Sequence, residues 1–157
     1  MGLATFKGGI HPYEGKELSE SKPVSVLQPK GEMVFPLSQH IGAPAKPLVA
    51  KGDHVLVGQK IGEPGGFISA CIISSVSGTV KSLEPRMVAN GAMVPSIIVE
   101  NDGMYETVEG FGEDRDPKTL SKEEIRNIVK EAGIVGLGGA GFPTHVKLTP
   151  KDESAID

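Results

Sequence analysis

A chain of 157 residues with 38% hydrophobic and 23% charged residues can bury the core of one domain of about 100 residues and carry an appended segment. The formal net charge is −4 and the lysines are spread along the chain, which argues against nucleic acid as a partner. Twenty-one glycines and twelve prolines, beside seven aromatic residues, favour short strands and many turns.

No stretch approaches the roughly 18 to 20 consecutive apolar residues that a membrane-spanning helix needs. The first nine residues lack the apolar core of a signal peptide, so the sequence favours the cytoplasm. Cys71 is the only cysteine, which excludes an internal disulfide, a zinc site with paired cysteines and an iron–sulfur cluster held by this chain alone. Its apolar neighbours indicate a buried, inert thiol.

Residues 1–22 are polar and glycine-rich and are predicted to form an N-terminal arm. Residues 23–104 are predicted to form a β domain, because short apolar runs alternate there with turn signals, as in a small barrel or sandwich. These runs are 24–27, 33–37, 48–50, 55–57, 69–73, 79–83 and 93–100. The expected fold is mainly β, and α+β overall, with no long helix between Val24 and Ser82.

Residues 105–120 are acidic and rich in glycine and proline, a composition typical of a linker. A helix should follow, because Ser121 and Glu124 form a capping-box pattern and Gly133 is suited to end the helix. The residues that fall on one face at helical spacing are Ile125, Ile128, Val129 and Ala132.

The segment 136–141 contains four glycines in six residues. Such a backbone lets successive N–H groups face one ligand and lets a flat ring approach closely, so it suits a phosphate. A helix beginning near Phe142 to Thr144 would add its N-terminal amides, and Lys147 would add a full positive charge. A flexible loop or a tight helix–helix contact explains the glycines almost as well. The usual dinucleotide fingerprint is not matched, because no convincing strand precedes the loop.

The segment GLGGAGFPTHVKL, which begins at Gly136, resembles the glycine-rich flavin and NADH loop of the flavoprotein subunit of respiratory complex I. Nearly the whole chain resembles the N-terminal third of the C subunit of the Rnf electron transport complex. The motifs that carry this resemblance are GGIHPYEGKELS, PLSQHIGAPAKPLVAKGDHVLVGQKIG, SSVSGTVKSLEPR, IIVENDGMYE and the glycine loop.

The resemblance implies a protein that exchanges electrons between NADH and ferredoxin through FMN and 4Fe–4S clusters, coupled to Na⁺ or H⁺ translocation. It implies a peripheral position on the cytoplasmic face of the membrane, with the other membrane subunits of the complex and NADH as partners and ferredoxin as an indirect one. The residues that match the family's cofactor loop are Gly136, Gly138, Gly139, Ala140, Gly141, Phe142, Pro143, Thr144 and Lys147. Leu137 and His145 depart from the complex I pattern, which has Arg and Gly there, so the substrate contacts of complex I do not carry over.

On this interpretation, residues 121–157 begin an FMN- and NADH-binding α/β domain that sequence after Asp157 would complete. The later sequence would supply the second wall of the flavin pocket and the cluster cysteines. We therefore expect this chain alone to be inactive, to contain no catalytic residue and to bind FMN only weakly. Phe142 has an alternative role as a core residue that anchors the loop.

The stretch GDHVLVGQKIG, followed by SSVSGTVKSL, resembles the barrel-sandwich hybrid fold of biotinyl and lipoyl carrier domains. Such carriers attach their cofactor to a lysine on an exposed hairpin, but no lysine lies between Ile61 and Val80. A structural or docking role is therefore the better interpretation of the β domain. Two alternatives stay open, namely a non-catalytic subunit-docking module and part of a cobalamin-reducing flavoprotein with the same N-terminal layout.

The remaining polar candidates show no pattern that favours chemistry. The histidines lack metal-ligand spacing and are predicted to be solvated or locally hydrogen-bonded, and we expect no metal site. They are His11, His40, His54 and His145. Asp53, Glu63 and Asp102 lie in predicted turns, and nothing in the sequence brings two of them together for acid–base catalysis.

Overall fold

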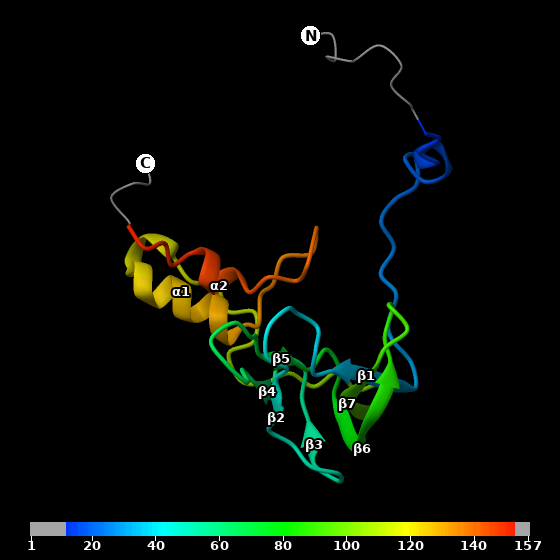
Figure 1. Ribbon diagram of the computed structural model, residues 1–157. Helices are drawn as coiled ribbons and strands as arrows, with labels where there is room; N and C mark the ends of the chain where they lie inside the picture. The colour runs from blue at the N-terminus through cyan, green and yellow to red at the C-terminus, as the bar shows by residue number, and fades with distance from the viewer. Residues whose placement is uncertain (1–11, 153–157) are drawn as a thin grey trace.

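The computed structural model describes residues 12–152, which form two antiparallel sheets followed by a pair of short helices (Figure 1). The four-stranded sheet has the order β1-β7-β6-β3, from β1 (Glu32–Pro36), β7 (Met93–Asn101), β6 (Gly78–Met87) and β3 (His54–Val55). The three-stranded sheet has the order β2-β4-β5, from β2 (Lys46–Pro47), β4 (Lys60–Glu63) and β5 (Ile72–Ile73). His11 and the start of the arm lie outside the described residues.

The two sheets enclose a core of mostly β-branched side chains, which pack well on a pleated surface. Strand β7 is the centre of this core, since Ile97, Ile98 and Val99 are fully buried. It pairs with β1 on one side and with β6 on the other, where the register shifts between Val80 and Ser82. The core residues are Phe35, Leu37, Ala45, Val55, Ile61, Ile72, Val76, Val80, Ile97 and Val99.

The prediction of a mainly β fold is confirmed, and within the described chain no helix lies between residues 24 and 82. The apolar runs 33–37, 79–83 and 93–100 coincide with β1, β6 and β7. The runs 55–57 and 69–73 overlap the two-residue strands β3 and β5. An α/β domain beyond the two helices stays a prediction.

Two of the apolar runs form no strand, and two strands, β2 and β4, lie outside the runs. Residues 24–27 pair with no strand of the described chain, and Val24 is 99% exposed. Residues 48–50 follow β2 and form no strand. Their hydrogen bonds are local, except the one that the N–H of Leu48 donates to the carbonyl of Ile61. Strand β4 was missed because Lys-Ile-Gly-Glu carries a single large apolar side chain, too weak a pattern to predict a strand.

The first residues of the predicted linker pack on the sandwich. Residues 106–108 run parallel to Val57, whose N–H donates to Glu106 O at 2.8 Å and whose carbonyl accepts from Val108 N–H at 3.0 Å. Tyr105 packs against the core, and its hydroxyl donates to the carbonyl of Pro29 at 2.5 Å. The segment then crosses to the helices through a 3₁₀ turn, η2 (Pro117–Thr119).

The predicted helix is present as α1 (Lys122–Glu131), and its capping box is confirmed. The N–H of Glu124 donates to Ser121 Oγ at 3.2 Å, and the N–H of Ser121 donates to the Glu124 carboxylate at 2.7 Å. The helix ends at Glu131 with Ala132 as its C-cap, and Gly133 follows with φ at +65°, as predicted for a glycine that stops the helix. The Glu131 carboxylate is 2.5 Å from Lys60 Nζ, so the C-terminal end of α1 is held against β4.

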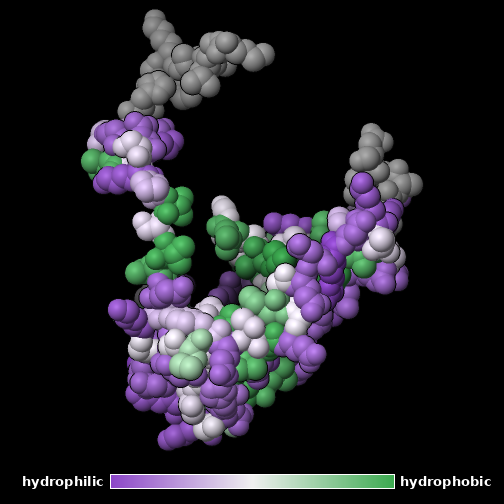
Figure 2. Space-filling view, turned by 180° about the vertical axis from the view of Figure 1, so that it is seen from behind, coloured by the Kyte–Doolittle hydropathy of each residue, from purple (hydrophilic) through white to green (hydrophobic). Residues whose placement is uncertain are grey.

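Residues 12–28, called the arm from here on, run away from the sandwich (Figure 1). The arm contains a 3₁₀ turn, η1 (Lys16–Leu18), and joins the sandwich where the carbonyl of Pro29 accepts from Asn101 Nδ2 at 2.7 Å. Hydrophobic residues gather on the arm close to the sandwich (Figure 2), where Val26 and Leu27 are exposed like Val24. Among residues 12–152, no helix has the length and apolarity needed to cross a membrane.

Candidate functional site

The glycine-rich segment forms a hairpin loop between α1 and the second helix, α2 (Thr144–Lys147). A bridge between Val135 and Pro143 closes the hairpin. The N–H of Gly136 donates to the carbonyl of Phe142, and the N–H of Thr144 donates to that of Ile134, both at 3.0 Å. The loop projects from the body of the molecule (Figure 1), and Leu137 at its tip is 95% exposed. A short ladder of backbone bonds therefore presents an open loop.

The loop leaves its backbone accessible. Residues 137–140 form a turn, but within residues 12–152 the N–H groups of residues 138–141 make no hydrogen bond of good geometry to a backbone or side-chain acceptor. A Cβ built on Gly138 or Gly139 would meet no atom within 4 Å. A ligand can therefore approach the backbone at these positions, and successive free N–H groups of this kind are typical of anion-binding loops.

The residues after the loop place one cation and one aromatic ring at its base. Lys147 Nζ lies 5.9 Å from the centroid of the Phe142 ring and 3.0 Å from the Cβ position of Gly136. The Phe142 ring is half-buried, so it anchors the loop and still exposes part of its surface. Pro143 is buried and Thr144 begins α2. Because α2 has only four residues, the predicted contribution of a helix N-terminus to phosphate binding is weak.

A groove of about 510 Å³ runs beside the glycine loop. One side is the loop itself, residues 135–141, and the other consists of residues 38–41 and of residues 88–90 at the tip of the β6–β7 hairpin. Of the residues predicted from the sequence, Gly136, Gly139, Ala140 and Gly141 line this groove. The groove lining does not include Gly138, Phe142, Pro143, Thr144 or Lys147. Sequence reasoning missed the opposite side of the groove, because residues 38–41 are distant in the chain and no spacing links them to the loop.

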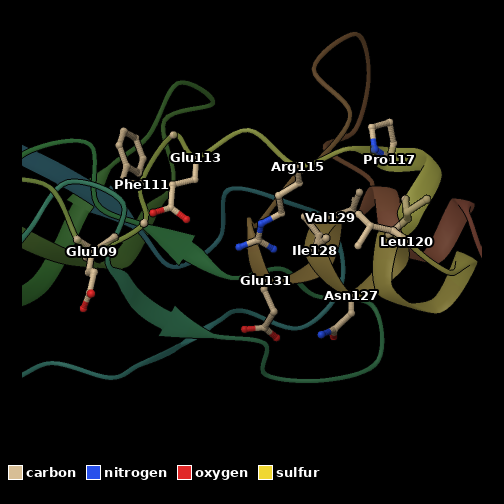
Figure 3. Close-up of a pocket in the computed structure, with 14 residues that line it drawn as sticks. Glu109, Phe111, Glu113, Arg115, Pro117, Leu120, Asn127, Ile128, Val129 and Glu131 are labelled. Carbon is tan, nitrogen blue, oxygen red and sulfur yellow. The ribbon is translucent and has the colours of Figure 1, made fainter.

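A larger hollow of about 670 Å³ lies between residues 108–120 and α1 (Figure 3). Its apolar lining includes Phe111, which is 55% exposed, and Ile128 and Val129 of α1. The charged groups around it are Glu109, Glu113, Glu131 and Arg115. Three carboxylates against one guanidinium leave a net negative charge that disfavours a phosphate, so this hollow suits an apolar group of a partner better than an anionic cofactor.

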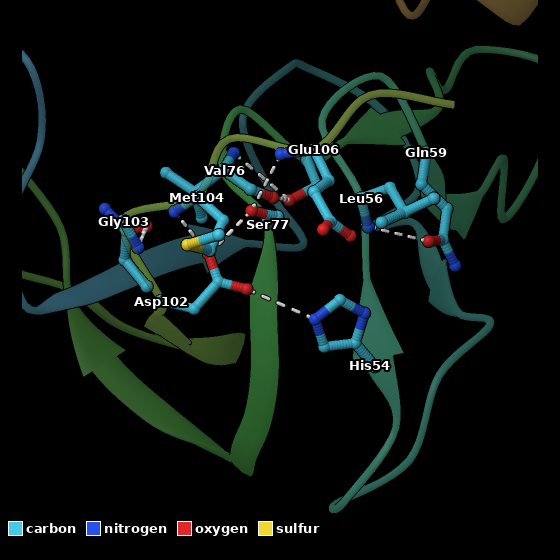
Figure 4. A network of polar contacts seen from close by, with 11 residues as sticks. His54, Leu56, Gln59, Val76, Ser77, Asp102, Gly103, Met104 and Glu106 are labelled. Carbon is cyan, nitrogen blue, oxygen red and sulfur yellow. Dashed lines mark hydrogen bonds and ion pairs between the residues drawn. The ribbon is translucent and has the colours of Figure 1, made fainter. Parts of the chain in front are cut away.

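Ser77, His54 and Asp102 form a polar cluster at the start of β6 (Figure 4). The Ser77 hydroxyl donates to Asp102 Oδ1 at 2.7 Å, and His54 Nε2 lies 3.2 Å from Asp102 Oδ2. The same three residue types make up a hydrolase triad, but there the serine donates to the imidazole. Here the buried serine donates to the carboxylate, so the cluster tightens the turn after β7 and activates no nucleophile.

The other titratable residues lie in surroundings that favour a structural role over a catalytic one. His40 is buried; its Nε2 accepts from Ala70 N–H at 3.2 Å and its Nδ1 lies 3.1 Å from the carbonyl of Ile41, which fits the neutral Nδ1–H tautomer. Burial and the nearby Lys130 lower the pKa of His145. Cys71 is buried, as predicted, and burial raises the pKa of its thiol. Residues 12–152 contain no group of three or more His, Cys, Asp or Glu side chains that could hold a metal ion.

Comparison with known proteins gives a consistent match. Residues 4–104 match the family model of the RnfC barrel sandwich hybrid domain. The chain is 41% identical over 155 residues to the C subunit of the proton-translocating ferredoxin:NAD(+) oxidoreductase complex of Clostridium ljungdahlii. It is 44% identical over 156 residues to the C subunit of the Na(+)-translocating ferredoxin:NAD(+) oxidoreductase complex of Acetobacterium woodii.

The C subunit of the ion-translocating oxidoreductase complex of Haemophilus influenzae is 37% identical over 153 residues. These matches cover 96% to 99% of the chain. The chain spans only about a third of the length of the Clostridium and Acetobacterium relatives, at 34% of each.

Proposed function

The chain belongs to the family of the RnfC barrel sandwich hybrid domain, and from this premise we propose that it is part of the C subunit of a ferredoxin:NAD(+) oxidoreductase complex. The names of the relatives state ion translocation, and we extend that property to the complex in which this chain works. The chain would be peripheral on the cytoplasmic face of the membrane, held there by the other subunits, with NADH as a direct partner and ferredoxin as an indirect one.

We assign FMN to the glycine loop, and the observation that carries this assignment is the row of N–H groups at residues 138–141 that donate to no acceptor of good geometry within residues 12–152. These amides and that of Gly136 would lie near the flavin phosphate, and Lys147 would compensate its charge. Phe142 would lie against a flavin or nicotinamide ring. Bound FMN supplies the conversion between two-electron exchange with NAD(H) and one-electron exchange with 4Fe–4S clusters. A 4Fe–4S cluster needs more cysteines than the single Cys71 that this chain contains.

The test measures FMN binding by the protein expressed from its whole gene and purified with and without added FMN. Gly139→Val fills the open space above the backbone without a clash inside the chain, so it should abolish FMN binding and leave the fold intact. Ala50→Val, in the exposed loop between β2 and β3, is the control and should keep FMN. If the Gly139→Val variant still binds FMN, the loop is not part of the FMN site. If the wild-type protein has no affinity for FMN, the assignment is refuted.

A second role, as a module that docks on another protein of the complex, is supported by the apolar surface that the chain exposes. The arm carries Val24, Val26 and Leu27 in an exposed segment, and the hollow beside α1 exposes Phe111 (Figures 2 and 3). Replacing the three arm residues with serine should release the protein from the membrane fraction and leave its FMN content unchanged. Retention of the triple variant in the membrane fraction would contradict a docking role of the arm.

A further inference from the structure

The glycine loop rests on one loop of the β sandwich, residues 38–41. Gly141 has φ at +66°, and a Cβ built on it would lie 3.0 Å from the carbonyl oxygen of Gln39 and 3.1 Å from the Cα of His40. Glycine is favoured at such a position both by its conformation and by the close approach of the two backbones. The contact therefore fixes where the glycine loop leaves the sandwich, and the groove of about 510 Å³ lies next to it.

Hydrogen bonds hold residues 38–41 and their neighbour Ala43 against the segment that leads into β5. The buried ring of His40 uses both nitrogens on backbone groups, accepting from Ala70 N–H and donating to the carbonyl of Ile41. A few residues further on, the N–H of Ala43 donates to the carbonyl of Ile68 at 2.9 Å. A buried imidazole with both nitrogens engaged in this way holds a loop in a single conformation.

We propose that residues 38–41 are the platform that positions the glycine loop for a phosphate-bearing ligand, and that His40 is the positioning residue of this site. The proposal rests on the function proposed above. The tip of the β6–β7 hairpin completes the platform side of the groove. Its turn is closed by the N–H of Val88 donating to the carbonyl of Ala92 at 2.9 Å and by the N–H of Ala92 donating to Asn90 Oδ1 at 3.0 Å. A ligand on the glycine loop thus faces two hydrogen-bonded loops of the sandwich.

The first test needs no ligand and uses the 157-residue chain. The amides of Gly136 and Thr144 close the glycine hairpin, so their hydrogen exchange by NMR reports how firmly the loop is held. His40→Ala should speed their exchange by about tenfold, while the amides of β7 stay unchanged. His40→Gln keeps a side-chain acceptor for Ala70 N–H and should restore most of the protection. Unchanged exchange in His40→Ala, or equal loosening in His40→Gln, would overturn the positioning role.

Gly141→Ala tests the same contact from the other side and serves if His40→Ala does not fold. It should also speed exchange at Gly136 and Thr144. In the gene-encoded protein, His40→Ala should weaken FMN affinity by at least about tenfold, a loss of about 1.4 kcal/mol, with recovery in His40→Gln. A loosened hairpin with unchanged FMN affinity would overturn the link to the ligand. A wild-type protein that binds no FMN would refute the proposed function, and the exchange rates would still decide the role of His40.

Discussion

At the scale of single residues, Asp102 joins the start of β6 to the turn that follows β7. Its carboxylate accepts from the hydroxyl of Ser77 and from the N–H of Met104, and it faces His54. The Ser77 hydroxyl is the largest cause of a lowered pKa at Asp102, followed by the Met104 N–H. A folded-state pKa below the unfolded value means that the carboxylate stabilises the fold above the unfolded pKa and loses this effect as the pH falls through the folded pKa.

Asp102→Asn should therefore destabilise the protein at pH 7 by more than it does in acid. The difference in unfolding free energy between wild type and variant should shrink as the pH falls below about 4, the usual pKa of an unfolded aspartate, and through the lower pKa of folded Asp102. Urea unfolding followed by circular dichroism, from pH 7 to about pH 3, measures this difference. Asp114→Asn, at an exposed position without a hydrogen bond in the structure, is the matched control. A constant difference for Asp102→Asn at all pH values would contradict the assignment.

Residue-scale roles could be predicted from the sequence only where the neighbours in the chain decide them. The burial of Cys71 follows from its apolar strand, and the cap at Ser121 follows from Glu124 three positions later. The contact of Gly141 with Gln39 joins distant parts of the chain, and no local pattern encodes it. For the same reason His40 could be predicted to be hydrogen-bonded, but not to lie under the glycine loop.

At the scale of elements, Gly133 after α1 packs closely against Cys71, the residue that precedes β5. Gly133 has φ at +65°, and a Cβ on it would lie 2.4 Å from the carbonyl oxygen of Cys71. Gly133→Ala combines backbone strain of roughly 1 kcal/mol with a clash that must displace the helix. Gly91→Ala is the matched control, because Gly91 has φ at +82° and open space around its Cβ position.

Gly133→Ala should therefore lower the free energy of unfolding by at least about 1 kcal/mol more than Gly91→Ala. Urea denaturation of the two variants and the wild type gives both values. Equal losses would mean that α1 is not held against the sandwich at this point. A larger loss for Gly91→Ala would place the strain in the β6–β7 turn instead.

The capping box makes a second, independent contribution to α1. Ser121→Ala removes the acceptor for the N–H of Glu124 and should cost about 1 kcal/mol, whereas Ser121→Asn supplies another acceptor and should cost little. Amide exchange of Glu124 should therefore speed up in the alanine variant alone. If both variants exchange alike, the cap hydrogen bond does not hold the first turn of α1.

The elements that could be predicted from the sequence are those with a long periodic pattern or a capping signal. Strands β1, β6 and β7 and helix α1 belong to this group. Residues 24–27 have the apolar pattern of a strand, but a strand also needs an adjacent strand to pair with, and residues 12–152 provide none. Strand β4 shows the converse, since two neighbouring strands pair with a segment of weak pattern.

At the scale of the whole molecule, the β sandwich is the base on which the helices and the glycine loop are arranged. Lys60 pairs with Glu131, and Gln39 and His40 contact Gly141, so the contacts with the sandwich lie at the end of α1 and beside the loop. The fold class could be predicted from the composition and the turns. The groove could not, because it forms only when segments from three parts of the chain come together.

In the proposed function, the amides of residues 138–141 bind a flavin phosphate. The 157-residue chain supplies the glycine loop and, opposite it, the side of the groove formed by residues 38–41 and 88–90. Ordering each backbone residue of the loop costs about 1 to 2 kcal/mol, so FMN binding to this chain should be weak. We expect a dissociation constant above about 100 μM for FMN. Riboflavin, which lacks the phosphate, should bind more weakly still.

An NMR titration of the isotope-labelled chain with FMN and with riboflavin tests whether these amides bind the phosphate, because each amide signal reports on its own surroundings. FMN should shift the amide signals of residues 136 and 138–141 and leave those of the hollow beside α1 unchanged, and riboflavin should shift the loop signals little. Equal shifts with riboflavin, or FMN shifts confined to residues 108–131, would contradict the claim.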